Sequence, residues 1–184
     1  MTIAIAKWSV EEYLRLVETG LLDEKPVELL AGDFVEMAPE GPLHSECIDS
    51  SADALRKVVP ADLKVREAHP ITLSDSVPEP DIAVVVRGKY RDRLPTASET
   101  KLVIEVAMSS LGKDLQVKRS LYAKAGIPEY WIIDISGEEE EHRVIVLTKP
   151  KDGDYTEEVI LQEGTVRSRV LPTVEIPVST LLGN

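Results

Sequence analysis

The sequence contains almost no cysteine and no long apolar run. Only one of its 184 residues, Cys47, is a cysteine, so an internal disulfide and a cysteine-based zinc site are both excluded. We interpret Cys47 as a small residue of the core. No apolar stretch reaches the length of a membrane-spanning helix, and the N-terminus lacks a basic region followed by a signal-like hydrophobic stretch. These absences favour a cytoplasmic protein with no membrane partner.

Basic residues are outnumbered by acidic ones, 21 to 33. The net charge of −12 argues against a simple nucleic-acid binder, because phosphate backbones attract proteins chiefly through Lys and Arg. The charge is unevenly distributed, however: residues 87–124 hold nine Lys or Arg and four Asp or Glu, a local charge of +5 that leaves −17 for the remainder. The densest basic part, 87–93, is either a substrate-contacting loop or a solvated connection. The overall acidity predicts weak nonspecific affinity for nucleic acid, or a partner that supplies it.

The pattern of apolar residues predicts an α/β fold in one domain over residues 1–184. The composition, 43% apolar and 29% charged, is ordinary for a soluble globular protein. We expect a mixed β-sheet flanked by helices, preceded by an N-terminal helix and hairpin and followed by short antiparallel strands. The expected helices are 9–17, 43–58 and 111–125; the hairpin is 27–37; the strands are 63–67, 82–86, 102–107 and 130–135, with tail strands 144–147, 158–161 and 170–178. The acidic run 138–141 is interpreted as a solvated hairpin tip.

A carboxylate interrupts one of these apolar strands. Glu105 lies within the run 101–108, where an ionised group costs several kcal/mol unless a cation, a metal or hydrogen bonds compensate it. Upstream, Asp81 opens the apolar strand 82–86. Two acids at strand positions are typical of a metal-dependent phosphodiesterase site. The structural alternatives are a strand-start acid that accepts backbone hydrogen bonds for Asp81, and a buried ion pair for Glu105.

A lysine lies on the apolar face of the helix expected after this strand. At about 100° per residue, Lys118 is central to the apolar stripe, and Asp114 and Tyr122 lie one turn away on either side. The stripe spans an arc of roughly 120° and comprises Leu111, Asp114, Leu115, Lys118, Leu121, Tyr122 and Ala125. The opposite side comprises Lys113, Gln116, Ser120 and Lys124. Lys118 either extends to the rim or pairs locally with Asp114, or it faces the two strand acids in a functional site.

Taken together, these residues resemble the Uma-two family of putative restriction endonucleases, within the PD-(D/E)XK nuclease superfamily. The resemblance covers about residues 10–150. The residues that carry it are Val-Glu-Leu-Leu-Ala-Gly-Asp at 27–33, His44, Pro-Asp at 80–81, Ile-Glu-Val-Ala-Met-Ser-Ser at 104–110, Asp114, Lys118, Tyr122 and Gly-Ile-Pro-Glu-Tyr-Trp-Ile-Ile-Asp at 126–134.

The resemblance implies a restriction-endonuclease-like core and Mg²⁺- or Mn²⁺-dependent hydrolysis of DNA. It implies that Asp81 and Glu105 are the metal ligands and, with Lys118, the catalytic residues. The superfamily's Glu-X-Lys is not intact, because Ala107 occupies the lysine position and Lys118 is the residue in place to serve. Many nucleases of this superfamily act as symmetric dimers, so a homodimer is expected by analogy.

Four auxiliary residues follow from the same resemblance, each with a structural alternative. Glu28 is either a further acid near the metal or a surface acid of the hairpin. His44 either contacts the substrate or acts in acid–base chemistry, or it is a capping histidine. Asp114 and Tyr122 are expected to orient Lys118, although Tyr122 could be a core residue whose hydroxyl is satisfied by Glu105.

Two other functions compete with a DNA endonuclease. The first is a non-catalytic binding or regulatory module that keeps the nuclease fold, favoured by the acidity and by the missing Glu-X-Lys lysine. The second is a metal-dependent hydrolase of another phosphoester, such as RNA or a nucleotide, for which an acidic surface is less of a handicap.

Overall fold

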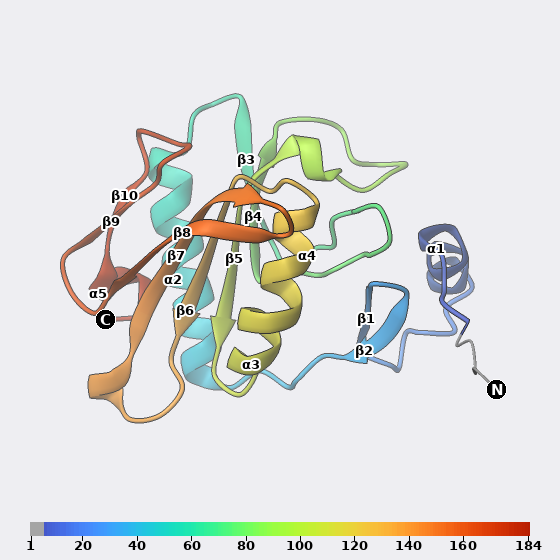
Figure 1. Ribbon diagram of the computed structural model, residues 1–184, viewed down its shortest axis with the longest axis horizontal. Coiled ribbons are helices and arrows are strands. Elements are labelled where there is room, and N and C mark those ends of the chain that lie inside the picture. The colour runs from blue at the N-terminus through green and yellow to red at the C-terminus, as the bar shows by residue number, and fades with distance from the viewer. Residues whose placement is uncertain (1–5) are drawn as a thin grey trace.

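The fold is built on a six-stranded mixed sheet (Figure 1). The computed structural model describes residues 6–184. The strand order is β3-β4-β5-β6-β7-β8; β5 and β6 are parallel and all other neighbours are antiparallel. The strands are β3 (Leu63–Glu67), β4 (Ile82–Val86), β5 (Thr100–Ala107), β6 (Glu129–Asp134), β7 (Arg143–Lys151) and β8 (Asp154–Leu161). The predicted mixed sheet flanked by helices is confirmed.

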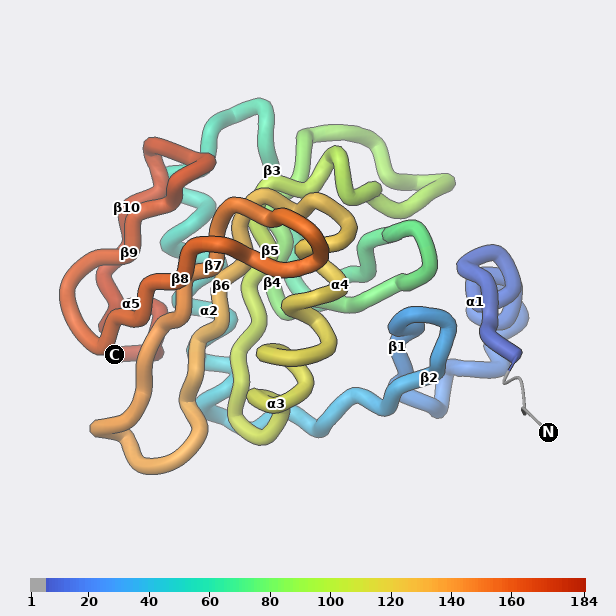
Figure 2. The backbone as a smooth tube through the Cα atoms, viewed as in Figure 1, coloured from blue at the N-terminus to red at the C-terminus, as the bar shows by residue number. Residues whose placement is uncertain are grey.

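Helices cover both faces of this sheet, as the ribbon and the backbone tube show (Figures 1 and 2). The helix α2 (Pro42–Val58) packs on one face together with the C-terminal segment. The other face carries three consecutive helical pieces: α3 (Leu111–Lys113), the π-helical turn η2 (Asp114–Lys118) and α4 (Arg119–Lys124). The C-terminal segment comprises β9 (Thr165–Arg167), β10 (Glu175–Pro177) and the short α5 (Val178–Leu181), with β9 and β10 antiparallel.

Alternation along the central strands produces two separate cores. In β4, Ile82 and Val84 face α2, whereas Ala83 and Val85 face α3 and α4, because successive side chains of a strand point to opposite faces. All four side chains are buried. A strand that is apolar on both faces is thus explained by helices on both sides, as expected for a sheet with a parallel crossover. Cys47 lies in the α2-side core, as predicted.

The N-terminal part forms a helix and a hairpin beside the sheet (Figure 1). The helix α1 (Val10–Glu18) begins with the predicted capping box, in which Ser9 and Glu12 bond each other's backbone N–H groups. The hairpin pairs β1 (Val27–Leu30) with β2 (Asp33–Glu36). Its turn is held by backbone hydrogen bonds with residues 75–77, and this contact places the buried end of β1 against the loop before β4.

Some local expectations differ from the structure in detail. The helix expected over 111–125 is interrupted by η2, a difference that matters for the site below. The segment 170–178 was expected to be one strand, but only β10 is extended. The acidic run at 138–141 is exposed, as expected, but it contains the short 3₁₀ helix η3 (Glu139–Glu141) between β6 and β7. A further 3₁₀ turn, η1 (Ala97–Glu99), precedes β5.

None of the helices described within residues 6–184 is long and apolar enough to cross a membrane. The cytoplasmic location and the single domain over 1–184 stay predictions.

Glu129 is a buried acid that connects β6 to the C-terminal segment. Its Oε1 accepts a hydrogen bond from Trp131 Nε1 (2.7 Å), and its Oε2 accepts one from Ser168 Oγ (2.8 Å) and others from the backbone N–H groups of Arg169 (2.9 Å) and Val170 (3.1 Å). Each of these donors is uncharged, so the carboxylate is held entirely by structural hydrogen bonds.

We expect Glu129→Ala to lower the free energy of unfolding by about 2–4 kcal/mol, because it leaves several buried donors unpaired. Urea denaturation checks this. Glu163→Ala, at an exposed position, is the matched control and should change stability by less than about 0.5 kcal/mol. Equal losses for the two variants would contradict a structural role for Glu129.

Candidate active site

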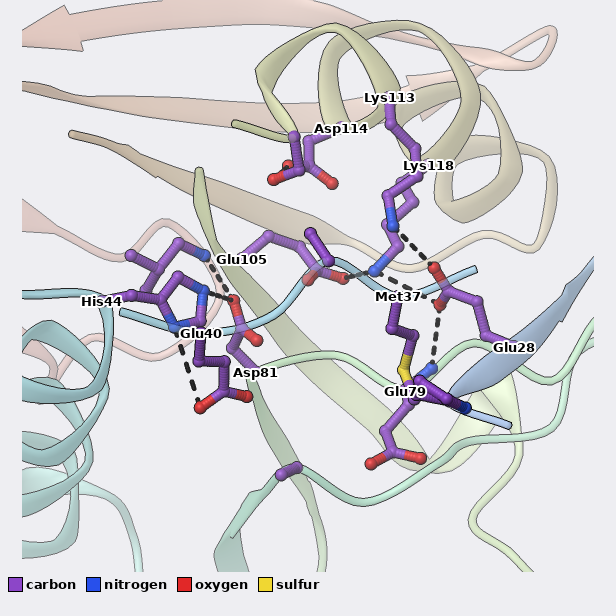
Figure 3. A pocket seen from close by; sticks show the side chains of 15 residues that line it. Glu28, Met37, Glu40, His44, Glu79, Asp81, Glu105, Lys113, Asp114 and Lys118 are labelled. Carbon is purple, nitrogen blue, oxygen red and sulfur yellow. Dashed lines mark hydrogen bonds and ion pairs between the residues drawn. The ribbon is translucent and has the colours of Figure 1, made fainter. Parts of the chain in front are cut away.

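A cavity of about 350 Å³ lies where the hairpin, the start of α2, the end of β5 and η2 meet (Figure 3). Its walls are rich in ionisable side chains. Those that line it are Glu28, Glu40, His44, Glu79, Asp81, Glu105, Lys113, Asp114 and Lys118. Six of the seven residues predicted from the sequence are therefore lining residues. The seventh, Tyr122, contacts the cavity residue Glu105 from the core.

Strand pairing brings Asp81 and Glu105 together. Ile82 on β4 lies opposite Ile104 on the antiparallel β5. The next positions, Asp81 and Glu105, therefore point to one face at the same end of the two strands. Asp81 Oδ2 also accepts a hydrogen bond from the backbone N–H of Val106 at 2.6 Å. This bond fixes one oxygen of the Asp81 carboxylate against β5.

Glu105 is buried, with 3% of its surface exposed. Its Oε1 accepts hydrogen bonds from Lys118 Nζ (2.8 Å) and Tyr122 Oη (2.7 Å). Burial raises the pKa of Glu105 to about 8; Lys118 opposes this rise, whereas the neighbouring carboxylates, led by Asp81, add to it. The buried contact with Lys118 that the sequence left open is present, and it becomes an ion pair when Glu105 is ionised. Any catalytic role for Glu105 therefore coexists with this contact.

Lys118 is equally buried and is shared by two acids. Besides its contact with Glu105, its Nζ lies 3.3 Å from Glu28 Oε2. Burial alone would lower the pKa of Lys118, but the surrounding carboxylates, led by Glu105 and Glu28, outweigh it and raise the pKa. Lys118 is therefore a fixed positive charge at neutral pH, suited to stabilising negative charge and not to accepting a proton.

The π-helical turn η2 brings a second lysine to the same place. In a regular helix Lys113 and Lys118, five residues apart, are separated by about 140°, which is why Lys113 was expected on the opposite side. That expectation is wrong: Lys113 Nζ donates to Glu28 Oε1 at 3.0 Å. In a turn closed by i→i+5 hydrogen bonds, residues five apart lie on one side. The π turn thus explains how both ammonium groups reach Glu28 (Figure 3).

Glu28 is a buried member of the site and not a surface acid of the hairpin. It is 1% exposed, and it also accepts the backbone N–H of Glu79 at 3.2 Å. With Lys113 and Lys118 on its two oxygens, its hydrogen-bonding capacity is largely used. Its contacts link the hairpin to η2 and to the loop that leads into Asp81.

Asp114 and Tyr122 were expected to orient Lys118. Neither forms a hydrogen bond with it among the described residues. Asp114 accepts from Ser110 Oγ at 2.6 Å, and Tyr122 donates to Glu105. Burial raises the pKa of Asp114, and the charge of Lys118 opposes the rise. Asp114 therefore acts on Lys118 through the electric field, whereas Tyr122 fixes the acceptor to which Lys118 donates.

His44 lies in the first turn of α2 and reaches Asp81 around the end of the sheet. Its Nε2 is 3.5 Å from Asp81 Oδ2, and its Nδ1 is 4.0 Å from Glu40 Oε2. The interaction with Asp81 raises the pKa of the imidazole, while burial opposes this. Sequence reasoning missed Glu40 and Glu79. No local signal marked Glu40, because it precedes the N-cap of α2 and becomes significant only beside His44 and Asp81.

The donor set of the cavity fits a divalent cation. Carboxylate oxygens are the ligands that Mg²⁺ and Mn²⁺ prefer, and a buried group of acids with fewer cations favours an added positive charge. One ligating atom from each of Glu40, His44 and Asp81 lies within 4.8 Å of the others.

Comparisons with known proteins give the family of the chain and a solved structure of similar fold. The chain belongs to the Uma2 family, whose model, described as a putative restriction endonuclease, matches residues 10–179. The resemblance noted from the sequence is therefore confirmed. No curated protein matches the chain. The fold is similar to the crystal structure of a putative nuclease belonging to DUF820 from Anabaena variabilis, with a TM-score of 0.68 over 95% of this chain and 97% of that chain, at 18% identity.

The raised pKa of Glu105 predicts how stability depends on pH. The unfolded chain releases this proton near pH 4.5, whereas the native protein holds it to about pH 8. The native state therefore binds more protons between these values, and the contribution of Glu105 to the free energy of unfolding falls as the pH rises through this window. Glu105→Gln removes that contribution, so its stability should depend less steeply on pH. Urea denaturation from pH 5 to 8.5 measures this, and parallel curves for the two proteins would contradict it.

Proposed function

We propose that this protein is a metal-dependent endonuclease that hydrolyses DNA phosphodiester bonds. The observation that carries the proposal is the meeting of two strand acids, Asp81 and Glu105, with the buried Lys118 in one cavity. Asp81 and Glu105 would hold Mg²⁺ or Mn²⁺ at the end of β4 and β5. The ion, when bound, would polarise the phosphate and supply an activated water.

The chain's own residues would stabilise the charge on the phosphate and hold the side chains of the site in place. Lys118, held cationic by its neighbours, would stabilise the negative charge that develops on the phosphate. Tyr122 would keep the Glu105 carboxylate in one orientation through its hydrogen bond to Oε1, which leaves Oε2 for the cation. Glu28 would hold Lys118 and Lys113 at the cavity wall. His44 and Asp114 would contribute to the electrostatic potential of the cavity.

The family supports this reaction, since its model is described as a putative restriction endonuclease. The similar Anabaena protein is described as a putative nuclease, and the likeness supports the fold on which such a site would be built. A homodimer, in which each protomer cuts one strand, and a cytoplasmic location are proposed by analogy only.

A cationic cluster around Tyr90 supports a nucleic-acid substrate despite the acidity of the whole chain. Three cations surround the ring of Tyr90, with Lys64 Nζ 5.4 Å, Arg66 Cζ 5.5 Å and Arg93 Cζ 5.2 Å from its centroid. Arg93 pairs with Glu99. Within residues 6–184, neither Lys64 nor Arg66 forms an ion pair with a carboxylate, which leaves both able to contact phosphate.

The register of the sheet places this cluster on the face that carries the cavity. Arg66 lies opposite Ala83, and Lys64 lies opposite Val85, on the antiparallel β3 and β4. Ala83 and Val85 point toward the side of α3 and α4, as Glu105 does. A duplex whose phosphate enters the cavity would therefore extend along the β3 edge over Lys64 and Arg66.

Lys64→Ala and Arg66→Ala are each expected to reduce the salt dependence of duplex binding. Each lost phosphate contact should lower the slope of log Kd against log salt by about 1. Fluorescence anisotropy with a labelled duplex in EDTA, which prevents cleavage, measures the slope. Lys151→Ala, an exposed lysine on β7, is the charge-matched control and should leave the slope unchanged. Equal slopes for the wild type and the three variants would show that the β3 edge does not contact DNA.

A non-catalytic module is the second candidate function, because the Glu105–Lys118 pair alone could be structural. In that case removal of either partner would destabilise the fold by several kcal/mol without any activity to lose. A site that serves catalysis would instead lose cleavage.

Cleavage of supercoiled plasmid separates the two candidates. We expect nicking by the wild type with Mg²⁺ or Mn²⁺, none with EDTA, and a loss of about 100-fold or more in Asp81→Ala and in Lys118→Ala, because each removes a group that the proposal places at the reacting phosphate. Lys124→Ala, exposed on the same helical segment, is the control and should cleave normally.

Inactivity of the wild type under all metal conditions would contradict the endonuclease. If Lys118→Ala then also melted at a much lower temperature and Mn²⁺ did not stabilise the wild type, the non-catalytic module would be supported. Comparison of plasmid with RNA and mononucleotides in the same assay tests the identity of the substrate.

A further inference from the structure

The ligating atoms around the cavity fall into two groups. On the hairpin side, Glu28 uses both oxygens on Lys113, Lys118 and the backbone of Glu79. Glu105 Oε1 is likewise occupied by Lys118 and Tyr122. The lysines therefore neutralise this half of the cavity. The half beside α2 has a different composition, with two carboxylates and an imidazole but no lysine or arginine among its lining residues.

His44 connects the two carboxylates of the α2 side. Its Nε2 is 3.5 Å from Asp81 Oδ2. Two atoms that bind one ion at about 2.1 Å each are about 3.4 Å apart at the tetrahedral angle, so the observed separation is close to that of two ligands of one ion. On the opposite edge of the ring, Nδ1 is 4.0 Å from Glu40 Oε2 (Figure 3). One ligating atom from each of the three residues lies within 4.8 Å of the others.

The two ring nitrogens have different surroundings. Nδ1 is fully buried and has no hydrogen-bond partner among the described residues, so it cannot meet a hydrated ion. Nε2 faces Asp81 at the cavity. A buried ring nitrogen requires a partner, and a carboxylate oxygen of Glu40 lies 4.0 Å from Nδ1. Metal-bound histidines commonly donate their second ring N–H to a carboxylate in this way.

We propose that His44 Nε2 is a nitrogen ligand of the divalent cation held by Asp81, and that Glu40 positions the ring by accepting the Nδ1 proton. A mixed nitrogen and oxygen site of this kind selects Mn²⁺ over Mg²⁺, because Mg²⁺ prefers oxygen ligands alone. Metal binding itself needs no DNA; only the use of the ion in hydrolysis rests on the proposed function.

The competing arrangement uses the same contacts without a metal. A protonated His44 could pair with Asp81 and Glu40 as a permanent cation, and it would then repel a divalent ion instead of binding it. The two arrangements predict opposite effects of removing the ring: loss of Mn²⁺ affinity if His44 is a ligand, and a gain if it is a fixed cation.

Calorimetric titration of the DNA-free protein with MnCl₂ and with MgCl₂ at pH 8 tests the proposal. His44→Ala should weaken Mn²⁺ binding roughly 10- to 100-fold and change Mg²⁺ binding by less than about 3-fold. His69→Ala, at an exposed histidine, is the matched control and should bind both ions as the wild type does. Unchanged or tighter Mn²⁺ binding in His44→Ala would overturn the proposal.

Glu40 has its own readout as a positioning residue. Glu40→Ala should weaken Mn²⁺ binding about tenfold, and Glu40→Gln should restore part of it, because the amide oxygen can still accept the Nδ1 proton. Asp49→Asn, exposed on α2, is the charge-matched control. Equal losses in the two Glu40 variants would contradict the positioning role.

A spectroscopic measurement keeps the proposal falsifiable if His44→Ala folds poorly. Electron spin echo spectra of bound Mn²⁺ should show nitrogen coupling in the wild type and in both Glu40 variants, and none in His44→Gln. Absence of nitrogen coupling from the wild type overturns the inference. Nitrogen coupling in a wild type that cleaves no DNA would retain this metal site and reject the proposed function; metal-dependent cleavage without nitrogen coupling would do the reverse.

Discussion

The buried contact between Glu105 and Lys118 is the interaction on which the rest of the site depends. A carboxylate in an apolar strand and an ammonium group on an apolar helix face are each costly alone, so their contact at 2.8 Å fixes η2 against β5. Tyr122 completes this arrangement by donating to the same oxygen. Further acids lie around the same lysine, and the cavity is left with a negative excess that a divalent cation can neutralise.

The π-helical turn separates the positive charges of the cavity from part of its negative charge. It directs both lysines of the helical segment to Glu28, and positive charge is thereby concentrated on the hairpin side. The α2 side keeps Asp81, Glu40 and His44 without a lysine or arginine. Insertions of this kind are rare in helices and frequent at functional sites, since they redirect side chains without ending the helix. The hairpin is equally necessary, because it alone carries Glu28 to the lysines.

Local patterns predicted much of the fold and several site residues. The strands β3 and β4 have the expected bounds because continuous apolar runs between turns produce a strand whatever lies far away in the sequence. The burial of Lys118 followed from helical periodicity, and that of Glu105 from its apolar neighbours. Lys113 could not be placed correctly, because periodicity assumes a regular helix and nothing local announces the π turn. Glu40 was missed since it precedes the helix and becomes significant only beside Asp81.

The sequence by itself determined which side chains are costly to bury and must therefore find partners: an acid in an apolar strand, a lysine in an apolar helix face, and an acid at a strand start. Only the tertiary structure decided what those partners are. The antiparallel pairing of β4 with β5 places Asp81 beside Glu105, the docking of α2 brings His44 to Asp81, and the hairpin supplies Glu28. Strand order and helix docking depend on how much apolar surface is buried between segments that are distant in the sequence. A local pattern of residues does not reveal this.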